Sequence, residues 1–233
     1  MNFGTDNEAR RISWVTGILS KIPPGKKILD AGAGEMPFRQ YCSHLRYTSQ
    51  DLSWSGTAKK KEGLQPASWE VSGVDIKSDI ASIPLKSRSV DAVLCTEVLE
   101  HLPDPLAALR EFSRLLKKGG WLILTAPFCS LTNFAPQFYC TGFSPYYYKK
   151  HLPSLGFKIK EVTPNGNYYE YLAQEAIRLE KVVKELSGQT FTYFDGLVGW
   201  LFIRILEKFS RRDPKQLTTP TLCFDYNVLA VKK

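Results

Sequence analysis

Lys27-Ile28-Leu29-Asp30-Ala31-Gly32-Ala33-Gly34 is the segment that constrains the fold of this chain most strongly. An apolar run that contains one carboxylate leads into two closely spaced glycines, which is the pattern of a buried strand followed by a glycine-rich turn. Glycines in such a turn let the backbone approach a bound ligand closely. Pro37 stands where the first turn of a following helix is expected. The segment therefore predicts a strand, a ligand-binding turn and a helix in succession.

Further strands and helices alternate along the first half of the chain. Thr5-x-x-Glu8 has the spacing of a capping box, and the helix behind it is expected to end at Pro23-Pro24-Gly25. Asp104-Pro105 starts another helix as N-cap and first-turn proline, and Gly119-Gly120 ends it. The predicted further strands are 47–52, 74–76, 90–95 and 121–125. This alternation predicts a parallel sheet covered on both faces, the doubly wound α/β class.

The second half of the chain is more aromatic and more helical. Its predicted elements are a helix from Ser144-Pro145, a strand over 157–162, helices over 170–186 and 191–209, and a strand over 222–231. The polar stretch 53–72, which contains Lys59-Lys60-Lys61, is predicted to be a surface excursion. At 233 residues, the whole chain fits one large domain.

Acidic side chains follow the predicted strands at the ends where a doubly wound sheet binds its ligands. Asp30, Asp51, Asp79 and Glu97 all lie at or just after such strand ends. Glu35 adds a second carboxylate beside the glycine turn, so a diphosphate would be repelled there and a cation attracted. The pattern therefore favours a positively charged nucleoside over a nicotinamide dinucleotide.

Four segments resemble the motifs of class I S-adenosylmethionine-dependent methyltransferases of type 11. They are Ile28-Leu29-Asp30-Ala31-Gly32-Ala33-Gly34, Asp79-Ile80-x-x-Ile83-Pro84, the run from Ser89 to Pro105, and Leu116-Lys117-Lys118-Gly119-Gly120-Trp121-Leu122-Ile123-Leu124-Thr125. The resemblance implies a Rossmann-like methyltransferase fold with a mostly parallel sheet and an antiparallel last strand. We accordingly predict a single methyltransferase domain over 1–233, with a cofactor-binding core at 25–130 and a helical insertion at 168–215 before the last strand.

The resemblance also implies roles for individual residues toward S-adenosylmethionine. Glycines of the turn would meet the methionine part, the acid after the second strand would take the ribose hydroxyls, and Asp79 would accept from the adenine amino group. Thr96 and Glu97 would lie near the transferring methyl. The expected cofactor-binding residues are Asp30, Ala31, Gly32, Gly34, Asp51, Leu52, Asp79, Ile80, Thr96 and Glu97.

Methyl transfer is an in-line displacement that depends mainly on holding the two reactants in attack geometry. A hydroxyl acceptor would also need a general base, and Glu97 and His101 are the candidate catalytic residues. The acceptor pocket is expected from the aromatic segment after the fourth clear strand, where rings could bind a sugar, a quinone-like ring or an apolar chain, or pack as an ordinary lid. The candidate substrate-binding residues are Phe128, Phe134, Tyr139, Tyr146 and Tyr147.

The net charge of +8, from 31 basic and 23 acidic residues, leaves several functions open. The favoured hypothesis is a methyltransferase acting on a small molecule, a saccharide or a lipid-linked acceptor. The alternatives are a tRNA methyltransferase, a nicotinamide-dependent dehydrogenase and a non-catalytic protein that binds an adenosine ligand. A nucleic-acid partner is not expected, because the lysines form no continuous stripe and no RNA-binding module is evident.

The segment 191–212 is apolar on nearly all sides for about two turns and then becomes basic. It could be a buried cover, a homodimer contact or a peripheral helix on anionic lipid, and burial or dimerisation is favoured. Five scattered cysteines without a C-x-x-C pair predict neither disulfides nor a metal site. With no apolar leader evident at the N-terminus, a cytoplasmic protein is expected, peripheral to the membrane if that segment binds lipid.

Overall fold

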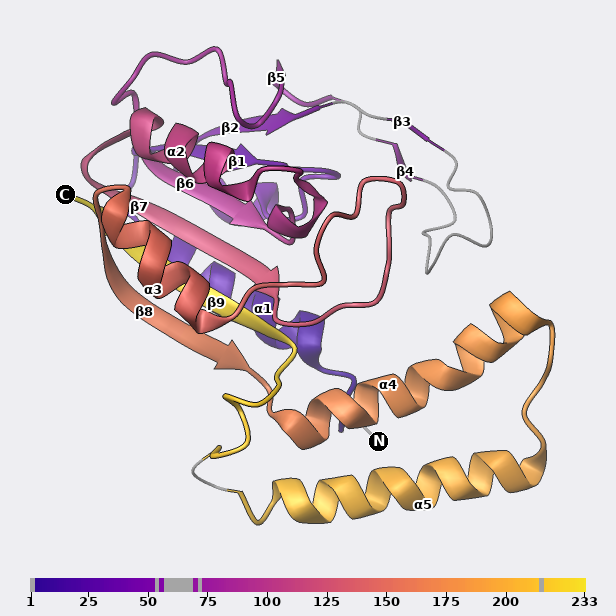
Figure 1. Cartoon of the computed structure of the whole chain (residues 1–233). Coiled ribbons are helices and arrows are strands. Elements are labelled where there is room, and N and C mark those ends of the chain that lie inside the picture. Colours follow the sequence, from indigo (N-terminus) through magenta and orange to yellow (C-terminus); the bar gives the residue numbers. More distant parts are fainter. Residues whose placement is uncertain (1–2, 53–54, 57–68, 71–72, 214–215) are drawn as a thin grey trace.

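A computed structural model of the chain describes residues 3–52, 55–56, 69–70, 73–213 and 216–233. Its centre is a seven-stranded sheet with the strand order β5-β2-β1-β6-β7-β9-β8 (Figure 1). The strands are β1 (Lys27–Ala31), β2 (Arg46–Asp51), β5 (Ile76–Lys77), β6 (Val90–Thr96), β7 (Leu116–Pro127), β8 (Phe157–Asn165) and β9 (Asp225–Lys232). The short strands β3 (Ser55–Gly56) and β4 (Trp69–Glu70) pair separately.

The strands β5, β2, β1, β6 and β7 are parallel, whereas β9 runs antiparallel to both of its neighbours, β7 and β8. The predicted α/β class, the mostly parallel sheet and the antiparallel last strand are therefore confirmed. The carboxyl ends of the parallel strands, the end of β8 and the start of β9 share one edge of the sheet, which we call the cofactor rim.

Helices cover both faces of the sheet (Figure 1). They are α1 (Asn7–Leu19), η1 (Arg39–Cys42), η2 (Leu99–His101), α2 (Pro105–Leu115), α3 (Pro145–Ser154), α4 (Tyr168–Val182), η3 (Val183–Ser187) and α5 (Tyr193–Ser210). Because successive strand residues point to opposite faces, neighbouring positions of β1 enter different cores. Leu29 joins the core that contains Phe112 of α2, and Ile28 joins the core that contains Val15 of α1.

Several predicted boundaries are shifted. The capping box at Thr5 is wrong: α1 begins at Asn7 with Asp6 as its N-cap, and the Asp6 carboxylate accepts from Arg10 Nε at 2.7 Å. Pro37 lies in a turn ahead of the short helix η1, not inside a helix. The helix α2 ends at Leu115, before Gly119-Gly120, because Leu116 already pairs with β6. Most of the predicted excursion at 53–72 lies outside the described residues.

The helices α4 and α5 form a hairpin that is inserted between β8 and β9 and projects away from the sheet (Figure 1). The predicted burial of 191–212 is wrong, since Leu206 is the buried residue of α5 and its other apolar side chains face solvent in large part. One face of α5 packs against α4, and the remaining faces contribute the exposed apolar surface. Within the described residues, no helix is both long and apolar enough to cross a bilayer.

Candidate active site

The glycine turn after β1 is closed by the neighbouring strand. The amides of Gly32 and Ala33 both donate to the backbone oxygen of Gln50, at 2.9 and 3.0 Å. Gly32 has φ +72°, and a Cβ there would lie 2.6 Å from Cγ2 of Val98. A residue larger than glycine would therefore be strained in its backbone and would also clash.

Asp51 is tied to the same turn from the end of β2. Its Oδ2 accepts a hydrogen bond from the Gly34 amide at 3.0 Å, and its side chain remains half-exposed. The two residues meet because β1 and β2 pair in parallel register up to Ala31 and Gln50. The structure thus places Asp51, predicted to bind the ribose, in direct contact with the glycine turn, predicted to bind the methionine part of the cofactor.

Asp30 is buried beneath this turn, where the Tyr47 hydroxyl donates to its Oδ2 at 2.6 Å. Burial raises the pKa of Asp30 to about 7, the Asp51 charge adds to that rise, and the Tyr47 hydrogen bond opposes it. Asp30 therefore supports the turn from below, and its charge is sensitive to any cation bound above it.

The residues predicted around the adenine lie at the adjoining end of the rim. Asp79 follows β5, and its Oδ1 accepts from the Ala81 amide at 2.7 Å in a local turn. Ile80 is buried in the core, whereas Leu52 is 65% exposed. Leu52 therefore offers a free apolar side chain beside Asp51, and Ile80 packs mainly against protein.

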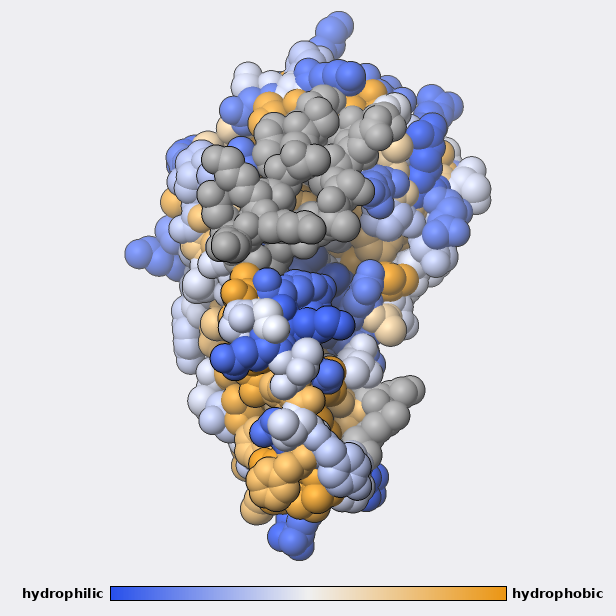
Figure 2. Space-filling model, turned by 90° about the vertical axis from the view of Figure 1, so that its right-hand side faces the viewer, coloured by the Kyte–Doolittle hydropathy of each residue, from blue (hydrophilic) through white to orange (hydrophobic). Residues whose placement is uncertain are grey.

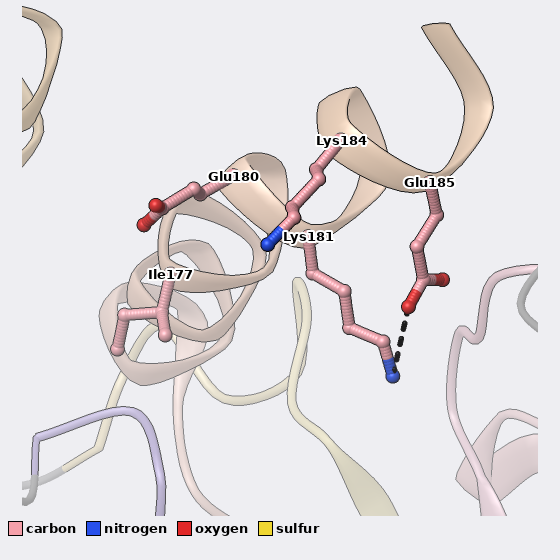
Figure 3. Close-up of a pocket in the computed structure, with 5 residues that line it drawn as sticks. All are labelled: Ile177, Glu180, Lys181, Lys184 and Glu185. Atoms are coloured by element: carbon pink, nitrogen blue, oxygen red, sulfur yellow. Dashed lines mark ion pairs between the residues drawn. The ribbon is translucent and has the colours of Figure 1, made fainter. Parts of the chain in front are cut away.

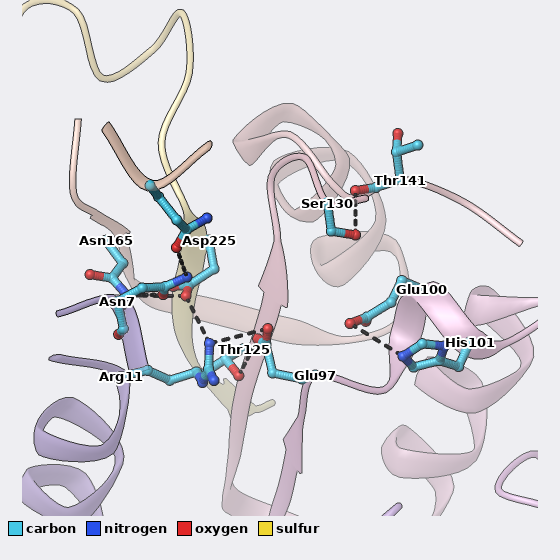
Figure 4. A network of polar contacts seen from close by, with 11 residues as sticks. Asn7, Arg11, Glu97, Glu100, His101, Thr125, Ser130, Thr141, Asn165 and Asp225 are labelled. Carbon is cyan, nitrogen blue, oxygen red and sulfur yellow. Dashed lines mark hydrogen bonds and ion pairs between the residues drawn. The ribbon is translucent and has the colours of Figure 1, made fainter. Parts of the chain in front are cut away.

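Glu97 ends the neighbouring strand β6 and is held in a left-handed backbone conformation, φ +54°. Both of its carboxylate oxygens have partners: Thr125 Oγ1 donates to Oε1 at 2.9 Å, and Arg11 Nη1 lies 3.2 Å from Oε2 (Figure 4). Thr96, which precedes it, is half-buried. The contacts of Glu97 suit a positioning group better than a free base.

Arg11 connects Glu97 to a second acid across the rim. Its Nη1 lies 3.3 Å from Oδ2 of Asp225, which also accepts from Asn165 Nδ2 at 3.0 Å (Figure 4). Asn165 donates in turn to the backbone oxygen of Asn7 at 2.9 Å. Burial raises the pKa of Asp225, and the nearby Glu97 charge raises it further. The first helix, the end of β8 and the start of β9 are thereby fastened to the cofactor rim.

Glu100 and His101 lie together in η2, on the other side of Glu97 (Figure 4). His101 Nδ1 lies 2.6 Å from the Gln137 backbone oxygen, and Nε2 lies 3.7 Å from Oε1 of Glu100. A carbonyl can only accept, so Nδ1 carries the proton and Nε2 keeps a lone pair in the neutral ring. Burial lowers the pKa of His101, which favours that neutral form.

Glu100 itself is only 3% exposed, and its Oε2 has no hydrogen-bond partner among the described residues. Burial and the neighbouring Glu97 charge raise the pKa of Glu100 well above the ordinary range. The Glu100 backbone oxygen accepts from the Tyr139 amide at 2.9 Å, which ties the aromatic segment to η2. A buried carboxyl group with a free oxygen beside a histidine is an arrangement typical of a functional site.

The structure divides the predicted aromatic residues into two groups. Phe134 meets the His101 ring edge-on at a centroid distance of 5.3 Å, and Phe138 lies at 6.0 Å from the same ring. Tyr139 is exposed at its side chain but bonded to Glu100 through its backbone. This group forms an apolar surround for the histidine.

The second aromatic group lies on and around α3. Phe128 packs edge-on against Tyr226 at 5.6 Å, and Tyr147 packs against Phe143 at 4.8 Å. The Tyr147 hydroxyl is buried without a partner among the described residues. Tyr146 is 70% exposed, and its ring joins neither of the two groups.

Sequence reasoning missed three residues of the site: Arg11, Glu100 and Asp225. Arg11 and Asp225 are separated by 214 positions and meet only through the folded sheet. Glu100 stands next to His101 within the quoted motif, so the adjacency of an acid and a histidine was the available signal.

The charge balance of the rim fits a cationic ligand. The Glu97 charge disfavours the ionised forms of both Glu100 and Asp225, and Arg11 compensates this only in part. Under the glycine turn, the Asp51 charge disfavours the ionised form of Asp30 in the same way. A sulfonium and an ammonium group would relieve both repulsions, so the residues present fit S-adenosylmethionine.

A surface depression on the helical hairpin is a separate feature. It is lined by Ile177, Glu180, Lys181, Lys184 and Glu185 of α4 and η3 (Figure 3). Lys181 and Glu185 form an ion pair across it at 3.9 Å. None of the predicted site residues lines this depression, and we assign it no part in the chemistry.

The strand order and the glycine turn after β1 are those of the class I methyltransferase fold. Residues 29–124 match the family model described as Methyltransferase domain, of type 11. The predictions of a methyltransferase enzyme and of S-adenosylmethionine as its cofactor are thereby confirmed at the level of the family. The nicotinamide and non-catalytic alternatives receive no support.

Individual relatives agree with this family. The chain is 30% identical over 119 residues to a ubiquinone biosynthesis O-methyltransferase of Cupriavidus pinatubonensis, covering 49% of this chain and 46% of the relative. It is 27% identical over 176 residues to the protein of that name from Xanthomonas axonopodis pv. citri, covering 74% and 70%. The fold resembles that of a SAM dependent methyltransferase from Archaeoglobus fulgidus, with a TM-score of 0.55, 17% identity and coverage of 99% and 96%. The match thus spans about half the length of the first of these relatives.

Proposed function

We propose that the chain is an S-adenosylmethionine-dependent O-methyltransferase that acts on a hydroxyl group of a small aromatic molecule. The relatives named as ubiquinone biosynthesis O-methyltransferases support oxygen as the accepting atom. The observation that carries the proposal is the setting of His101: its Nδ1 is held by the Gln137 carbonyl, and its Nε2 is left as the basic atom.

The cofactor would be held along the rim by residues with distinct tasks. Gly32 and Gly34 present backbone to its methionine part, and Asp51 presents a half-exposed carboxylate to its ribose. The buried acids Glu100 and Asp225 would favour its positive charges. When bound, S-adenosylmethionine supplies an electrophilic methyl group, so the protein's own task is to bind, orient and deprotonate the acceptor.

His101 would take the proton of the acceptor hydroxyl at Nε2. Such a transfer contributes typically about 10²–10⁴-fold to a rate, provided that the base is neutral at the working pH. Burial lowers the pKa of His101 and so keeps it neutral near pH 7. Glu100 lies 3.7 Å from Nε2, so the imidazolium that forms would in turn favour the ionised form of this buried carboxyl.

The aromatic surround favours a ring as acceptor over a saccharide. Phe134 and Phe138 flank the His101 ring, and rings of this kind pack well edge-on or offset against another aromatic group. An acceptor ring lying beside them would direct its hydroxyl toward Nε2.

The test is a methyl-transfer assay with radiolabelled S-adenosylmethionine and parallel acceptor panels: catechols and other phenols, monosaccharides, and bulk tRNA. We expect transfer to phenolic hydroxyls, with the product identified as a methyl ether. Transfer to tRNA or to saccharides alone would overturn the assignment of the acceptor. Calorimetry with S-adenosylmethionine and NADH provides the cofactor control, and heat from NADH alone would overturn the family assignment.

A further inference from the structure

The free side of α5 carries an extended apolar surface. Two rows of side chains at helical spacing are each between 40% and 89% exposed, and Trp200 lies beside them at 49%. The rows are Tyr193, Leu197, Leu201 and Ile205, and Phe194, Val198, Phe202 and Phe209. A large aromatic side chain has roughly 150–250 Å² of surface, so at these exposures the two rows and Trp200 together present several hundred Å², which is at the upper end of what a soluble monomer commonly leaves bare.

This surface faces away from the protein. Leu206, the buried residue of α5, lies on the side that packs against α4, and the first row occupies the opposite side. The second row lies between these two sides, and its last member, Phe209, stacks on Tyr169 of α4 at a ring-centroid distance of 6.1 Å. Figure 2 shows apolar side chains gathered at the lower end of the molecule, which Figure 1 identifies as the hairpin. We call this exposed side of α5 the hairpin face.

The charges on the hairpin face are basic and are confined to its C-terminal third. Arg204, Lys208, Arg211 and Arg212 are exposed there. Glu207 is shared by Arg204 at 2.8 Å and Arg211 at 2.7 Å, while Lys208 and Arg212 have no ion pair with any described residue. At the other end, Asp195 is occupied in a capping box with Thr192.

This charge pattern selects among the possible occupants. In a parallel dimer through this face, the basic ends of the two α5 helices would lie side by side and repel each other. In an antiparallel dimer, Lys208 and Arg212 would lie against apolar side chains of the other copy, with no acidic residue to compensate their charges. Anionic lipid head groups provide the missing negative charge, and the acyl region accepts the apolar rows. We propose that the hairpin face docks on the surface of an anionic lipid bilayer, with α5 lying in the plane of the interface.

The base of the hairpin is fixed to the cofactor rim, so docking would also orient the site. Asn167 caps α4 and donates to Ser210 Oγ of α5 at 2.9 Å. Arg10 of α1 holds Glu170 of α4 at 2.7 Å. Because β8 leads into α4 and β9 returns at Asp225, the hairpin joins the sheet at the rim, and a bilayer on the hairpin face would lie beyond the hairpin on that same side of the molecule. An acceptor with an apolar tail could then be methylated at the membrane surface, a consequence that rests on the proposed function.

Vesicle co-sedimentation tests the docking itself. We expect the protein to pellet with vesicles of phosphatidylglycerol mixed with phosphatidylcholine at low salt, and to remain in solution with phosphatidylcholine alone. At about 1 kcal/mol for each basic residue near a charged membrane, K208E/R212E should weaken the binding by roughly 30-fold or more. L201S/F202S should also abolish it, because two of the exposed apolar side chains are removed.

The matched control is K86E/K118E, which changes the net charge by the same amount. Both lysines are exposed and lie at the opposite edge of the sheet, one before β6 and one near the start of β7. It should bind vesicles nearly as the wild type does. Absence of vesicle binding by the wild type, or equal loss in the control, would overturn the proposal. So would a dimer in sedimentation velocity that L201S/F202S converts to a monomer. Calorimetry with S-adenosylmethionine on each variant keeps this result separate from a failure of the proposed function.

Discussion

The backbone oxygen of Gln137 lies 2.6 Å from Nδ1 of His101 and so fixes which ring nitrogen carries the proton. The two residues are 36 positions apart, and the contact joins η2 to the aromatic segment that would receive the acceptor. The carbonyl therefore leaves Nε2 as the proton-accepting atom.

Replacing the base should abolish most of the activity. In H101N the side-chain amide can still donate to the Gln137 carbonyl, but no basic nitrogen remains, so kcat should fall about 10²–10⁴-fold while binding of S-adenosylmethionine is retained. In the wild type, kcat/KM should fall with acid through a pKa below about 6.5, because burial lowers the pKa of His101. H44N is the matched control, and a pH profile that is identical in H101N and the wild type would contradict the role.

Removing the charge of Asp51 should weaken cofactor binding in two steps. D51N keeps an oxygen that can accept from the Gly34 amide, whereas D51A loses that contact as well. We expect roughly 10-fold weaker binding of S-adenosylmethionine for D51N and a further loss for D51A, as hydrogen bonds to charged groups contribute about 1.5–3 kcal/mol. Calorimetry measures the affinity of each variant for S-adenosylmethionine. Equal affinity in D51N, D51A and the wild type would exclude Asp51 from the site.

The glycine turn should tolerate no side chain at position 32. G32A adds a Cβ 2.6 Å from Val98 Cγ2 at φ +72°, so backbone strain and overpacking both act, each at about 1–3 kcal/mol. Gly25 has nearly the same φ, +76°, and open space around it, so G25A should show the strain alone. Urea unfolding should rank G32A as clearly less stable than G25A, with V98A restoring part of the loss. If G32A and G25A were equally stable, the steric explanation would be wrong.

Asp30 should make stability depend on pH. Its pKa is about 7 in the folded protein and about 3.9 in the unfolded chain, so the folded state binds more protons between these values. Stability contributed at this site therefore falls as the pH rises from about 4 to 7 and stays low above 7. D30N keeps an acceptor for the Tyr47 hydroxyl and lacks this titration.

The stability of D30N relative to the wild type should therefore be greater at pH 8.5 than at pH 5, by an amount on the order of a few kcal/mol. Urea unfolding of both proteins at the two pH values measures this difference. Asp225 titrates in both proteins, so its contribution cancels. A difference that does not change with pH would show that Asp30 is ionised throughout.

Local sequence signals located most of the central elements. The apolar run 27–31 became β1 with its predicted bounds, and the pair Asp104-Pro105 began α2 as expected, with Ala107 N donating to the Asp104 carboxylate. These signals are reliable because each acts over a few residues: side-chain alternation, a cap and a fixed proline φ. The end of α2 was misplaced, since pairing of Leu116 with Val90 depends on a distant strand.

The sequence by itself determined the sheet class, the glycine turn and the acids that follow β1 and β2, because these features depend on local pattern and on parallel strands ending at one edge. Only the tertiary structure decided that Arg11 joins Glu97 to Asp225, that Glu100 is buried beside His101, and that α5 is exposed. Those outcomes depend on which distant segments share a face or an edge. An apolar helix is compatible with a core, a partner or a lipid surface, so its pattern alone cannot choose among them.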